Sequence, residues 1–184
     1  MLRFGSLLTG FEYTHMKRTH GIEKRGTLMS SQVKRTFTVD GRPFFPTGGQ
    51  ARNSSGYNDA ESETAFRAVQ LIGGNTLEIP VYWDQIEPEE GTFDFGSVDA
   101  LLASARRHGL KLVLLWFGTW KNGDMDYAPA WVKTNPGRFH RVISPTGKDC
   151  WVLSSHCRAN FEADLRAFTA LCRRLGRGVW AGRR

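Results

Sequence analysis

Apolar positions follow two different periods along the chain from residue 36 onwards. Residues 36–50 read TFTV, the turn DGRP and then FFPTGGQ, and two extended runs on either side of Asp-Gly predict a β-hairpin. Residues 61–74 read ESETAFRAVQLIGG, which ends in two glycines. The apolar residues in this stretch recur at helical spacing and are Ala65, Phe66, Val69 and Leu71 or Ile72. The second stretch is therefore predicted to be a helix that stops at the glycines.

The same alternation of strand and helix continues further along the chain. TLEIPVYW (residues 76–83) predicts a strand, and its Pro80 lacks a ladder donor, so we expect this proline at the strand end or at a bulge. SVDALLASARRHG predicts a helix with Ser97 as N-cap and Gly109 as the stop. KLVLLWF (residues 111–117) is continuously apolar, as expected for a parallel strand that is covered on both faces.

The order of these elements predicts the fold class. A long aromatic and polar segment leads to a third predicted helix over residues 159–175, and repeated strand-helix units are the signature of an α/β fold with a parallel sheet. The order fits a partial (β/α)8 TIM barrel of about three β/α units behind a leading β-hairpin, because a full barrel needs roughly 250 residues. A doubly wound sheet is the alternative, but the sequence contains no GxGxxG or GxxxxGK(S/T) phosphate loop.

Three segments are predicted along the chain. Residues 1–35 show neither helical nor strand periodicity and mix Thr, Gly, Lys and Arg, which indicates an irregular basic extension; Met29 would be an equally plausible beginning of the chain. Residues 36–175 carry the regular pattern and form the predicted domain. Residues 176–184 read GRGVWAGRR and are interpreted as a basic tail outside the domain.

Charge and cysteine content exclude several classes of protein. The formal net charge is +7, but Lys and Arg gather at the two ends while the middle mixes signs, so nucleic-acid binding is not indicated. The three cysteines show no CxxC spacing and are interpreted as free thiols. The sequence has neither the apolar run of a signal peptide nor the roughly 18 apolar residues of a membrane span. We therefore expect a cytoplasmic protein without a membrane partner.

Polar and aromatic residues gather directly after the three predicted strands. GGQARNSS follows the first, YWDQIEP the second and WKNGDMDY the third, and barrels place their working residues at such strand ends. Aromatic faces pack against the apolar faces of pyranose rings while acids and amides bond the hydroxyls, so a sugar is the predicted ligand. The candidate sugar-binding residues are Gln50, Asn53, Glu78, Tyr82, Trp83, Glu87, Trp116, Trp120 and Asn122.

Several of these candidates also have a purely structural interpretation. Glu87 lies in Glu-Pro-x-x-Gly, which has the composition of a turn and favours a structural role. Tyr82 and Trp83 could equally contact a ligand or pack in the barrel rim. Asn122 could equally form an Asn-Gly turn, and one of Trp116 and Trp120 is expected in the core.

No metal or cofactor is predicted. His140, His156 and Cys157 lie near Asp149 and Cys150 in the sequence, but their spacing matches no zinc template.

The string W-x-x-x-E-P-x-x-G-x-F-D-F runs from Trp83 to Phe95. With its flanking strands it resembles the early barrel of clan A glycoside hydrolases, specifically the beta-galactosidases of family 35 and more distantly those of family 42. The resemblance covers about residues 36–175 and implies a TIM barrel that acts, with retention, on the O-glycosidic bonds of galactosides in carbohydrate metabolism. Relatives often carry Glu where Gln50 stands, so this position departs from the pattern.

The resemblance also implies where the catalytic groups of the family lie. Retaining glycosidases need two carboxyl groups about 5 to 5.5 Å apart, and in the family an acid/base Glu follows strand four in an Asn-Glu pair while the nucleophile Glu follows strand seven. This sequence contains no Asn-Glu pair. We therefore expect both catalytic positions to lie beyond the end of the chain, and no catalytic residue is assigned.

Two hypotheses of different classes follow. The first is a truncated beta-galactosidase-like glycoside hydrolase that is inactive alone. The alternative is a non-catalytic carbohydrate-binding module, or a half-barrel whose unpaired third-strand edge recruits a complementary barrel fragment. The expected partner is a galactoside or another carbohydrate in either case.

Overall fold

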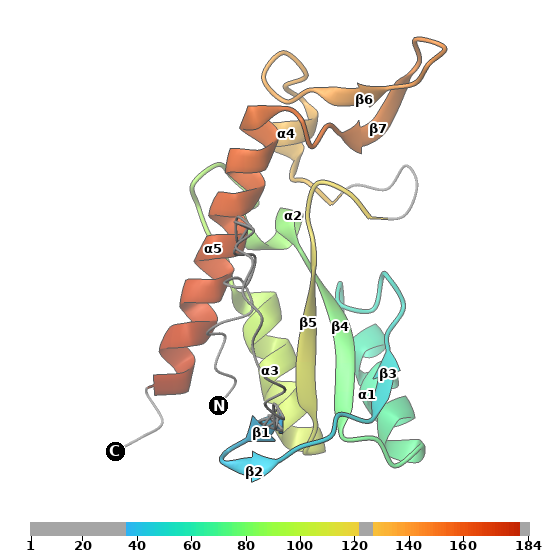
Figure 1. Ribbon diagram of the computed structural model, residues 1–184, viewed down its shortest axis with the longest axis vertical. Helices are drawn as coiled ribbons and strands as arrows, with labels where there is room; N and C mark the ends of the chain where they lie inside the picture. Colours follow the sequence, from blue (N-terminus) through green and yellow to red (C-terminus); the bar gives the residue numbers. More distant parts are fainter. Residues whose placement is uncertain (1–35, 122–126, 181–184) are drawn as a thin grey trace, which may run out of the picture. The chain divides into compact units, whose positions relative to one another are not determined.

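The computed structural model describes residues 36–121 and 127–180 (Figure 1). The chain divides into two compact units, Met1–Phe45 and Pro46–Arg184. Among the described helices, none combines the length and the apolar character needed to cross a membrane.

The first unit contains the predicted hairpin in a shortened form. Strand β1 (Thr38–Val39) pairs antiparallel with β2 (Arg42–Pro43). The two residues between them, Asp40 and Gly41, both have positive φ, at 50° and 76°, as a type I′ turn requires. The turn is confirmed, but the second strand ends at Pro43 and does not run on to residue 50.

The second unit is built on an open parallel sheet of three strands (Figure 1). Its order is β3 (Gly48–Gln50), β4 (Thr76–Tyr82) and β5 (Lys111–Phe117), and both pairings are parallel. The α/β class with a parallel sheet is therefore confirmed. The sheet of the described residues does not close into a barrel.

Strand β5 differs from its prediction. It pairs with β4 alone within the described part of the chain, so it lies at an edge of the sheet. Its first four residues alternate between exposed and intermediate burial, and Val113 is 42% exposed. The expectation of a strand covered on both faces is wrong for β5, because its outer edge and the sheet face that carries Val113 have no described neighbour to bury them. Strand β4, by contrast, lies between the other two strands and is largely buried.

Pro80 lies inside β4 without a bulge, contrary to the prediction. It pairs in register with Leu115 of β5. The carbonyl of Glu78, two residues earlier, accepts from Ala51 beyond the end of β3, so Pro80 also faces the β3 side of the strand, where β3 has already ended. The missing N–H of Pro80 therefore removes no ladder hydrogen bond.

Helices α1 (Asp59–Leu71) and α3 (Gly96–His108) supply much of the core against β4. The core cluster includes Phe66 and Val69 from α1, Val98, Leu101 and Ala105 from α3, and Leu77, Ile79 and Val81 from β4. Leu71 and Ile72 do not join this face as predicted, since they are 87% and 70% exposed at the end of the helix. The predicted amphipathic helices are otherwise confirmed.

The helix boundaries show which stop and start signals act. Asn58 caps α1, its side-chain oxygen accepting from the N–H of Glu61 at 2.9 Å. Ser97 is not the N-cap of α3, because the helix begins one residue earlier at Gly96 and Asp94 accepts from the Gly96 N–H at 2.7 Å. Gly109 ends α3 with φ of 66°, as predicted.

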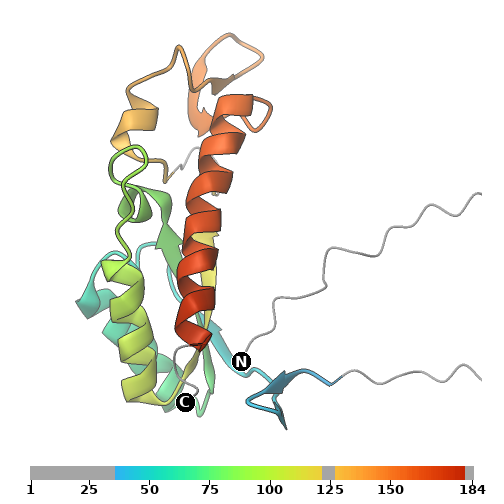
Figure 2. The ribbon, with the colours of Figure 1, turned by 90° about the vertical axis from the view of Figure 1, so that its left-hand side faces the viewer.

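The remainder of the second unit includes a long helix, α5 (Arg158–Trp180). Short helices α2 (Trp83–Ile86) and α4 (Ala130–Lys133) and the antiparallel strands β6 (Arg141–Ile143) and β7 (Asp149–Leu153) precede it. Figure 2 shows α3 and α5 side by side, and an ion pair of 2.6 Å joins Arg174 to Asp99. Helix α5 continues five residues past Leu175, so the predicted boundary between domain and tail falls inside a helix.

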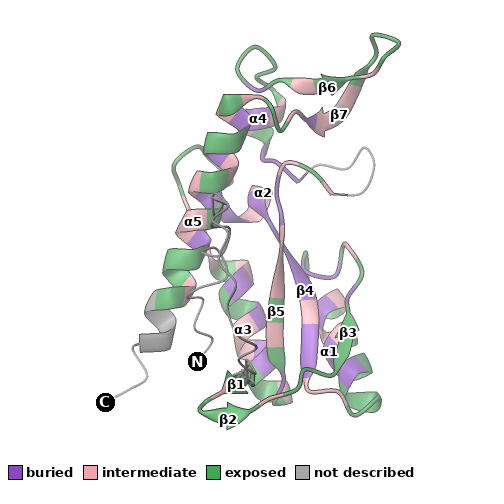
Figure 3. Cartoon of the chain, in the orientation of Figure 1, coloured by how far each residue is buried: buried purple, intermediate pink, exposed green. Residues whose placement is uncertain are grey.

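Burial divides α5 into two apolar faces (Figure 3). Ala163, Ala167 and Leu171 are buried against the rest of the unit, whereas Phe161, Leu165 and Phe168 are 58%, 48% and 41% exposed. We call these last three residues the exposed α5 stripe.

Candidate functional site

Four aromatic rings meet at the carboxyl ends of β4 and β5. Tyr82 and Phe117 are the last residues of these strands and pair in register, with ring centroids 5.8 Å apart. Tyr57 stacks on Tyr82 at 3.7 Å, and Tyr127 lies 5.4 Å from Tyr82 and 4.9 Å from Phe117. These four residues form the aromatic cluster.

The loop after β3 is attached to Tyr82, which explains the position of Tyr57. The Tyr82 hydroxyl donates to the backbone oxygen of Asn53 at 2.7 Å and accepts from the N–H of Gly56 at 3.0 Å. A Cβ on Gly56 would lie 2.1 Å from the carbonyl oxygen of Pro80, so only glycine allows this approach. The loop is thereby held against β4, and the next residue, Tyr57, is placed over the Tyr82 ring.

Asp84 supplies the charge of the site. Its Oδ2 accepts from the Tyr57 hydroxyl at 3.2 Å, and its backbone N–H donates to the backbone carbonyl oxygen of Tyr127 at 3.0 Å. Burial, and then the Asp84 charge and hydrogen bond, raise the pKa of Tyr57 well above its usual value. Burial also raises the pKa of Tyr82, to about 12, so these phenols remain protonated donors at neutral pH.

Only one ring of the cluster presents substantial surface to a ligand. Tyr82, Phe117 and Tyr127 are buried, whereas Tyr57 is 39% exposed. The ammonium of Lys121 lies 4.9 Å from the centroid of Phe117. The arrangement therefore offers an aromatic face, a carboxylate and a nearby cation, which are groups that can hold a polar ring with apolar faces.

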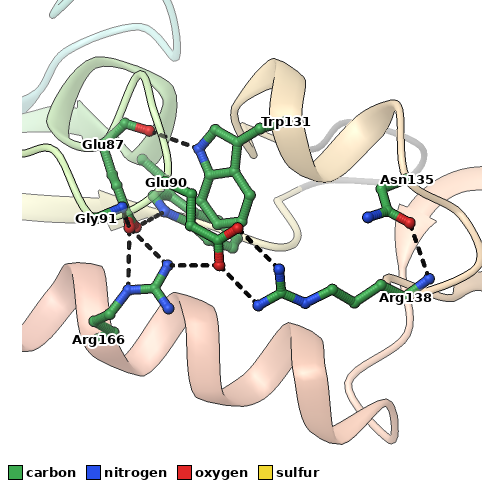
Figure 4. Close-up of polar contacts among 8 residues, drawn as sticks. Glu87, Glu90, Gly91, Trp131, Asn135, Arg138 and Arg166 are labelled. Carbon is green, nitrogen blue, oxygen red and sulfur yellow. Dashed lines mark hydrogen bonds and ion pairs between the residues drawn. The ribbon is translucent and has the colours of Figure 1, made fainter.

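Glu87 lies in a different environment (Figure 4). Its carboxylate is fully buried. Oε1 accepts from the Gly91 N–H at 2.8 Å and from Arg166 at 2.6 and 3.0 Å, while Oε2 accepts from the Trp83 indole at 3.0 Å. The Glu87 carboxylate therefore accepts four hydrogen bonds from the protein, which is consistent with a structural role in fixing the turn.

The rest of this turn is attached to neighbouring elements. The carbonyl oxygen of Glu87 accepts from the Trp131 indole of α4 at 3.0 Å. Glu90 forms a two-pronged ion pair with Arg138 at 2.8 and 2.7 Å (Figure 4), and the hydrogen bonds from Arg138 hold the pKa of Glu90 below its usual range. The Pro-Glu-Glu-Gly stretch thus connects α2, α4 and α5.

The structure brings two of the predicted site residues into the candidate site, Asn53 through its backbone and Tyr82 through its ring. Gln50 and Glu78 pair in register on β3 and β4, Gln50 exposed and Glu78 half-buried. Trp83 is fully buried and bonded to Glu87.

The remaining predicted residues come from the segment that begins in β5. Trp116 donates to Asp164 of α5 at 2.6 Å and lines a hollow of about 340 Å³ with the exposed α5 stripe. Trp120 is 60% exposed, so of these two tryptophans it is Trp116 that packs on a helix. Asn122 lies outside the described residues.

The predicted sugar-binding residues do not include Tyr57, Phe117 or Tyr127, and they leave out Asp84 although it stands in the YWDQIEP stretch singled out after the second strand. One signal was available, because Tyr82 and Phe117 both end apolar runs of a parallel sheet and such ends meet at one edge. Nothing local marks Tyr57 or Tyr127, since both are placed by contacts between distant segments.

Among the described residues, no group of three His, Cys, Asp or Glu side chains could hold a metal ion.

Part of the chain matches a known protein family. Residues 55–134 match the family model of the beta-galactosidases of glycoside hydrolase family 42, a span that includes all four aromatic-cluster residues and Asp84. Among solved structures, an exo-beta-1,4-mannosidase from Opitutaceae bacterium strain TAV5 matches 48% of this chain at 23% identity with a TM-score of 0.40. Endo-glycoceramidase II from Rhodococcus sp., solved as a lactosyl-enzyme intermediate, matches 70% at 18% identity with a TM-score of 0.41.

The chain spans 17% and 32% of the lengths of these two proteins. The predicted resemblance to family 42 is thus confirmed over residues 55–134, and that to family 35 stays a prediction. Over this segment the chain is similar to glycoside hydrolases of the beta-galactosidase type.

Proposed function

We propose that this chain forms about three β/α units of a beta-galactosidase-like glycoside hydrolase barrel and binds a galactoside at the aromatic cluster. The observation that carries the proposal is the position of the cluster, at the carboxyl ends of β4 and β5 and within the segment that matches the family. Ligands of parallel α/β sheets bind at this edge.

The chemistry of the cluster suits a pyranose. The exposed face of Tyr57 packs against the C–H face of the sugar ring. Asp84 accepts from sugar hydroxyls, and the oxygen of the Tyr57 phenol, whose O–H is donated to Asp84, can accept from a further sugar hydroxyl. The three buried rings keep Tyr57 and Asp84 in a fixed relation to each other, so little conformational entropy is lost when the sugar binds.

Hydrolysis requires more than this site provides. A retaining mechanism needs two carboxyl groups about 5 to 5.5 Å apart. In the described part of the cluster burial first, and then the charge of one carboxylate, that of Asp84, raises the pKa values of the tyrosines. The 184 residues contain no Asn-Glu pair. These residues by themselves are therefore proposed to bind a galactoside without cleaving it.

Calorimetric titration with methyl β-D-galactoside tests the binding, and a chromogenic galactoside tests the absence of turnover. We expect dissociation constants on the order of millimolar, about −4 kcal/mol, and complete loss of binding in Tyr57→Ala. Phe161→Ala removes a ring outside the cluster that is more exposed than Tyr57, at 58% against 39%, and should leave the affinity unchanged. Equal affinities in the two variants, or a turnover that Asp84→Asn abolishes, would contradict the proposal.

A second candidate function is a half-barrel completed by a complementary fragment, and the edge of β5 favours it. Lys111 donates toward β4, so Leu112, Leu114 and Trp116 direct their backbone groups away from β4. The exposed α5 stripe adds an apolar surface, and it lines a hollow together with Trp116. This combination fits one further parallel strand followed by a helix.

Thiol labelling would detect such a partner. Cys172 is exposed on α5, four residues after Phe168. A peptide comprising the fourth strand and helix of a family 42 beta-galactosidase should protect Cys172 from an alkylating reagent and leave the labelling of Cys157 unchanged, as peptide mapping would show. Unaltered labelling of Cys172 at saturating peptide would exclude this function.

A further inference from the structure

The ion pair between the buried Glu87 carboxylate and the partly exposed Arg166 side chain lies next to the short helix that carries Asp84. Glu87 is the C-terminal cap of α2, and its N–H donates to the Trp83 oxygen at 2.8 Å. Its carboxylate Oε2 accepts a hydrogen bond from the Trp83 indole N–H at 3.0 Å. The two ends of α2 are therefore fixed to one carboxylate, which Arg166 in turn holds at 2.6 Å.

Helix α2 is also the element that orders Tyr57. Asp84 accepts from the Tyr57 hydroxyl at 3.2 Å, and the Gln85 side chain donates to the Tyr57 carbonyl at 3.5 Å. A displacement of α2 would thus break contacts with both the ring end and the backbone of Tyr57. The contacts reach from α5 to the exposed ring of the aromatic cluster through a single four-residue helix.

A second line of contacts leads from Glu87 to Tyr127. The Glu87 carbonyl oxygen accepts from the indole of Trp131, which lies four residues after Tyr127. The backbone N–H of Asp84 donates to the Tyr127 carbonyl oxygen at 3.0 Å. The Arg166 guanidinium lies 5.6 Å from the Trp131 ring centroid. Arg166 lies on α5 between the buried residues Ala163 and Ala167.

We propose that Arg166 is a positioning residue for the sugar site: through Glu87 it sets the place of α2 and of the Tyr127 segment, and so aligns Asp84 with Tyr57. The inference rests on the proposed function for its consequence in binding, but its structural content stands on the contacts alone. Arg166 lies outside the segment that matches the family, residues 55–134, so this control over the site comes from a separate part of the chain.

Fluorotyrosine labelling with ¹⁹F NMR tests the alignment directly, with Tyr57→Phe to assign the Tyr57 signal. In Arg166→Met we expect shifted Tyr57 and Tyr127 signals. Binding of methyl β-D-galactoside should be about tenfold weaker, the size expected when the misaligned Asp84 carboxylate loses one hydrogen bond to the sugar. Arg166→Lys, which keeps the cation, should restore part of both effects. Arg138→Met removes the neighbouring ion pair with Glu90 and is the matched control, with signals and affinity expected to stay as in the wild type.

The double variant Glu87→Gln, Arg166→Met removes the charge pair without leaving a buried carboxylate unpaired, and it is used if the single variant does not fold. Unchanged tyrosine signals in either folded variant, or equal shifts in Arg138→Met, would overturn the proposal. Unfolding of both would also overturn it, because the pair would then support the whole fold and not the site. Absence of galactoside binding in the wild type would refute the proposed function, while the NMR signals would still decide the role of Arg166.

Discussion

Glu87 is the side chain on which most of the local architecture depends. An acidic residue loses several kcal/mol of hydration when it is buried unless other groups replace the water. Here a backbone N–H, an indole and a guanidinium supply four hydrogen bonds. Its neighbour Glu90 forms an equally good ion pair but in an exposed place.

The two glutamates should therefore differ sharply when truncated. Glu87→Ala leaves the Arg166 cation and two further donors without their acceptor, and we expect it to lower the free energy of unfolding by about 3–5 kcal/mol. Glu90→Ala, the control in the same turn, should cost no more than about 1 kcal/mol. Urea denaturation followed by circular dichroism measures both, and similar losses would show that burial of Glu87 is not the deciding factor.

Glu63 provides a pH-dependent contribution at another place. Its carboxylate accepts from His108 at 2.7 Å, from Arg107 at 2.8 Å and from Ser104 at 3.0 Å. The His108 contact first, and then that of Ser104, lower the pKa of Glu63 from 4.5 to about 2. A carboxylate with a lowered folded-state pKa stabilises the fold above its unfolded-state pKa and loses this effect as the pH falls.

The stability difference between wild type and Glu63→Gln should accordingly be constant above about pH 4.5 and shrink as the pH falls toward about 2. Thermal unfolding at a series of pH values measures it. Glu162→Gln removes an exposed carboxylate paired with Arg158 and serves as the reference. A difference that grows on acidification would contradict the assigned direction.

Secondary-structure elements show where local signals suffice and where they mislead. The sequence pattern predicts one N-cap, Ser97, at the start of the second helical pattern, and indicates none for the first. In the structure Asn58 makes the capping hydrogen bond to Glu61, but Ser97 lies one residue inside α3. The Asp94 side chain serves the Gly96 N–H instead.

These two positions give a matched test at the level of the helix. Asn58→Ala should lower the free energy of unfolding by about 1 kcal/mol, because the Glu61 N–H loses its acceptor. Ser97→Ala should change it by less than about 0.5 kcal/mol, as for a surface substitution that removes no cap. Chemical denaturation compares the variants, and a larger loss in Ser97→Ala would restore the prediction made from the sequence.

At the scale of the whole second unit, α5 uses two faces for different purposes. One face carries Ala163, Ala167 and Leu171 into the core, while the exposed α5 stripe meets solvent. Contiguous apolar surface of this kind is uncommon on monomeric proteins and marks interaction sites or a tendency to associate. In the same unit, the edge of β5 that faces away from β4 has no partner strand among the described residues.

Replacing the stripe should therefore affect association more than folding. We expect Leu165→Lys with Phe168→Glu to reduce dye binding and concentration-dependent association, with a change in unfolding free energy within about 0.5 kcal/mol per site. Leu171→Ala, on the buried face of the same helix, should instead cost about 2–5 kcal/mol. Sedimentation analysis and denaturation separate the two effects, and a large destabilisation by the stripe variant would show that these side chains pack in solution.

The sequence by itself determined the features that depend on short stretches of chain. Periodicity specified the amphipathic character of α1 and α3, Gly109 specified where α3 stops, and Asp40-Gly41 specified the hairpin turn. The alternation of strands and helices specified the parallel sheet. Each of these follows from the conformational preferences and side-chain spacing of neighbouring residues.

Only the tertiary structure decided which side chains meet. Glu87 is buried because Arg166 reaches it from 79 residues away, and Tyr57 joins the aromatic cluster because the Tyr82 hydroxyl holds the loop before it. Pro80 is tolerated inside β4 only because β3 ends before it. The physical reason is common to all three: local propensity acts between near neighbours in sequence, whereas burial and hydrogen bonding depend on contacts that exist only after distant segments have packed together.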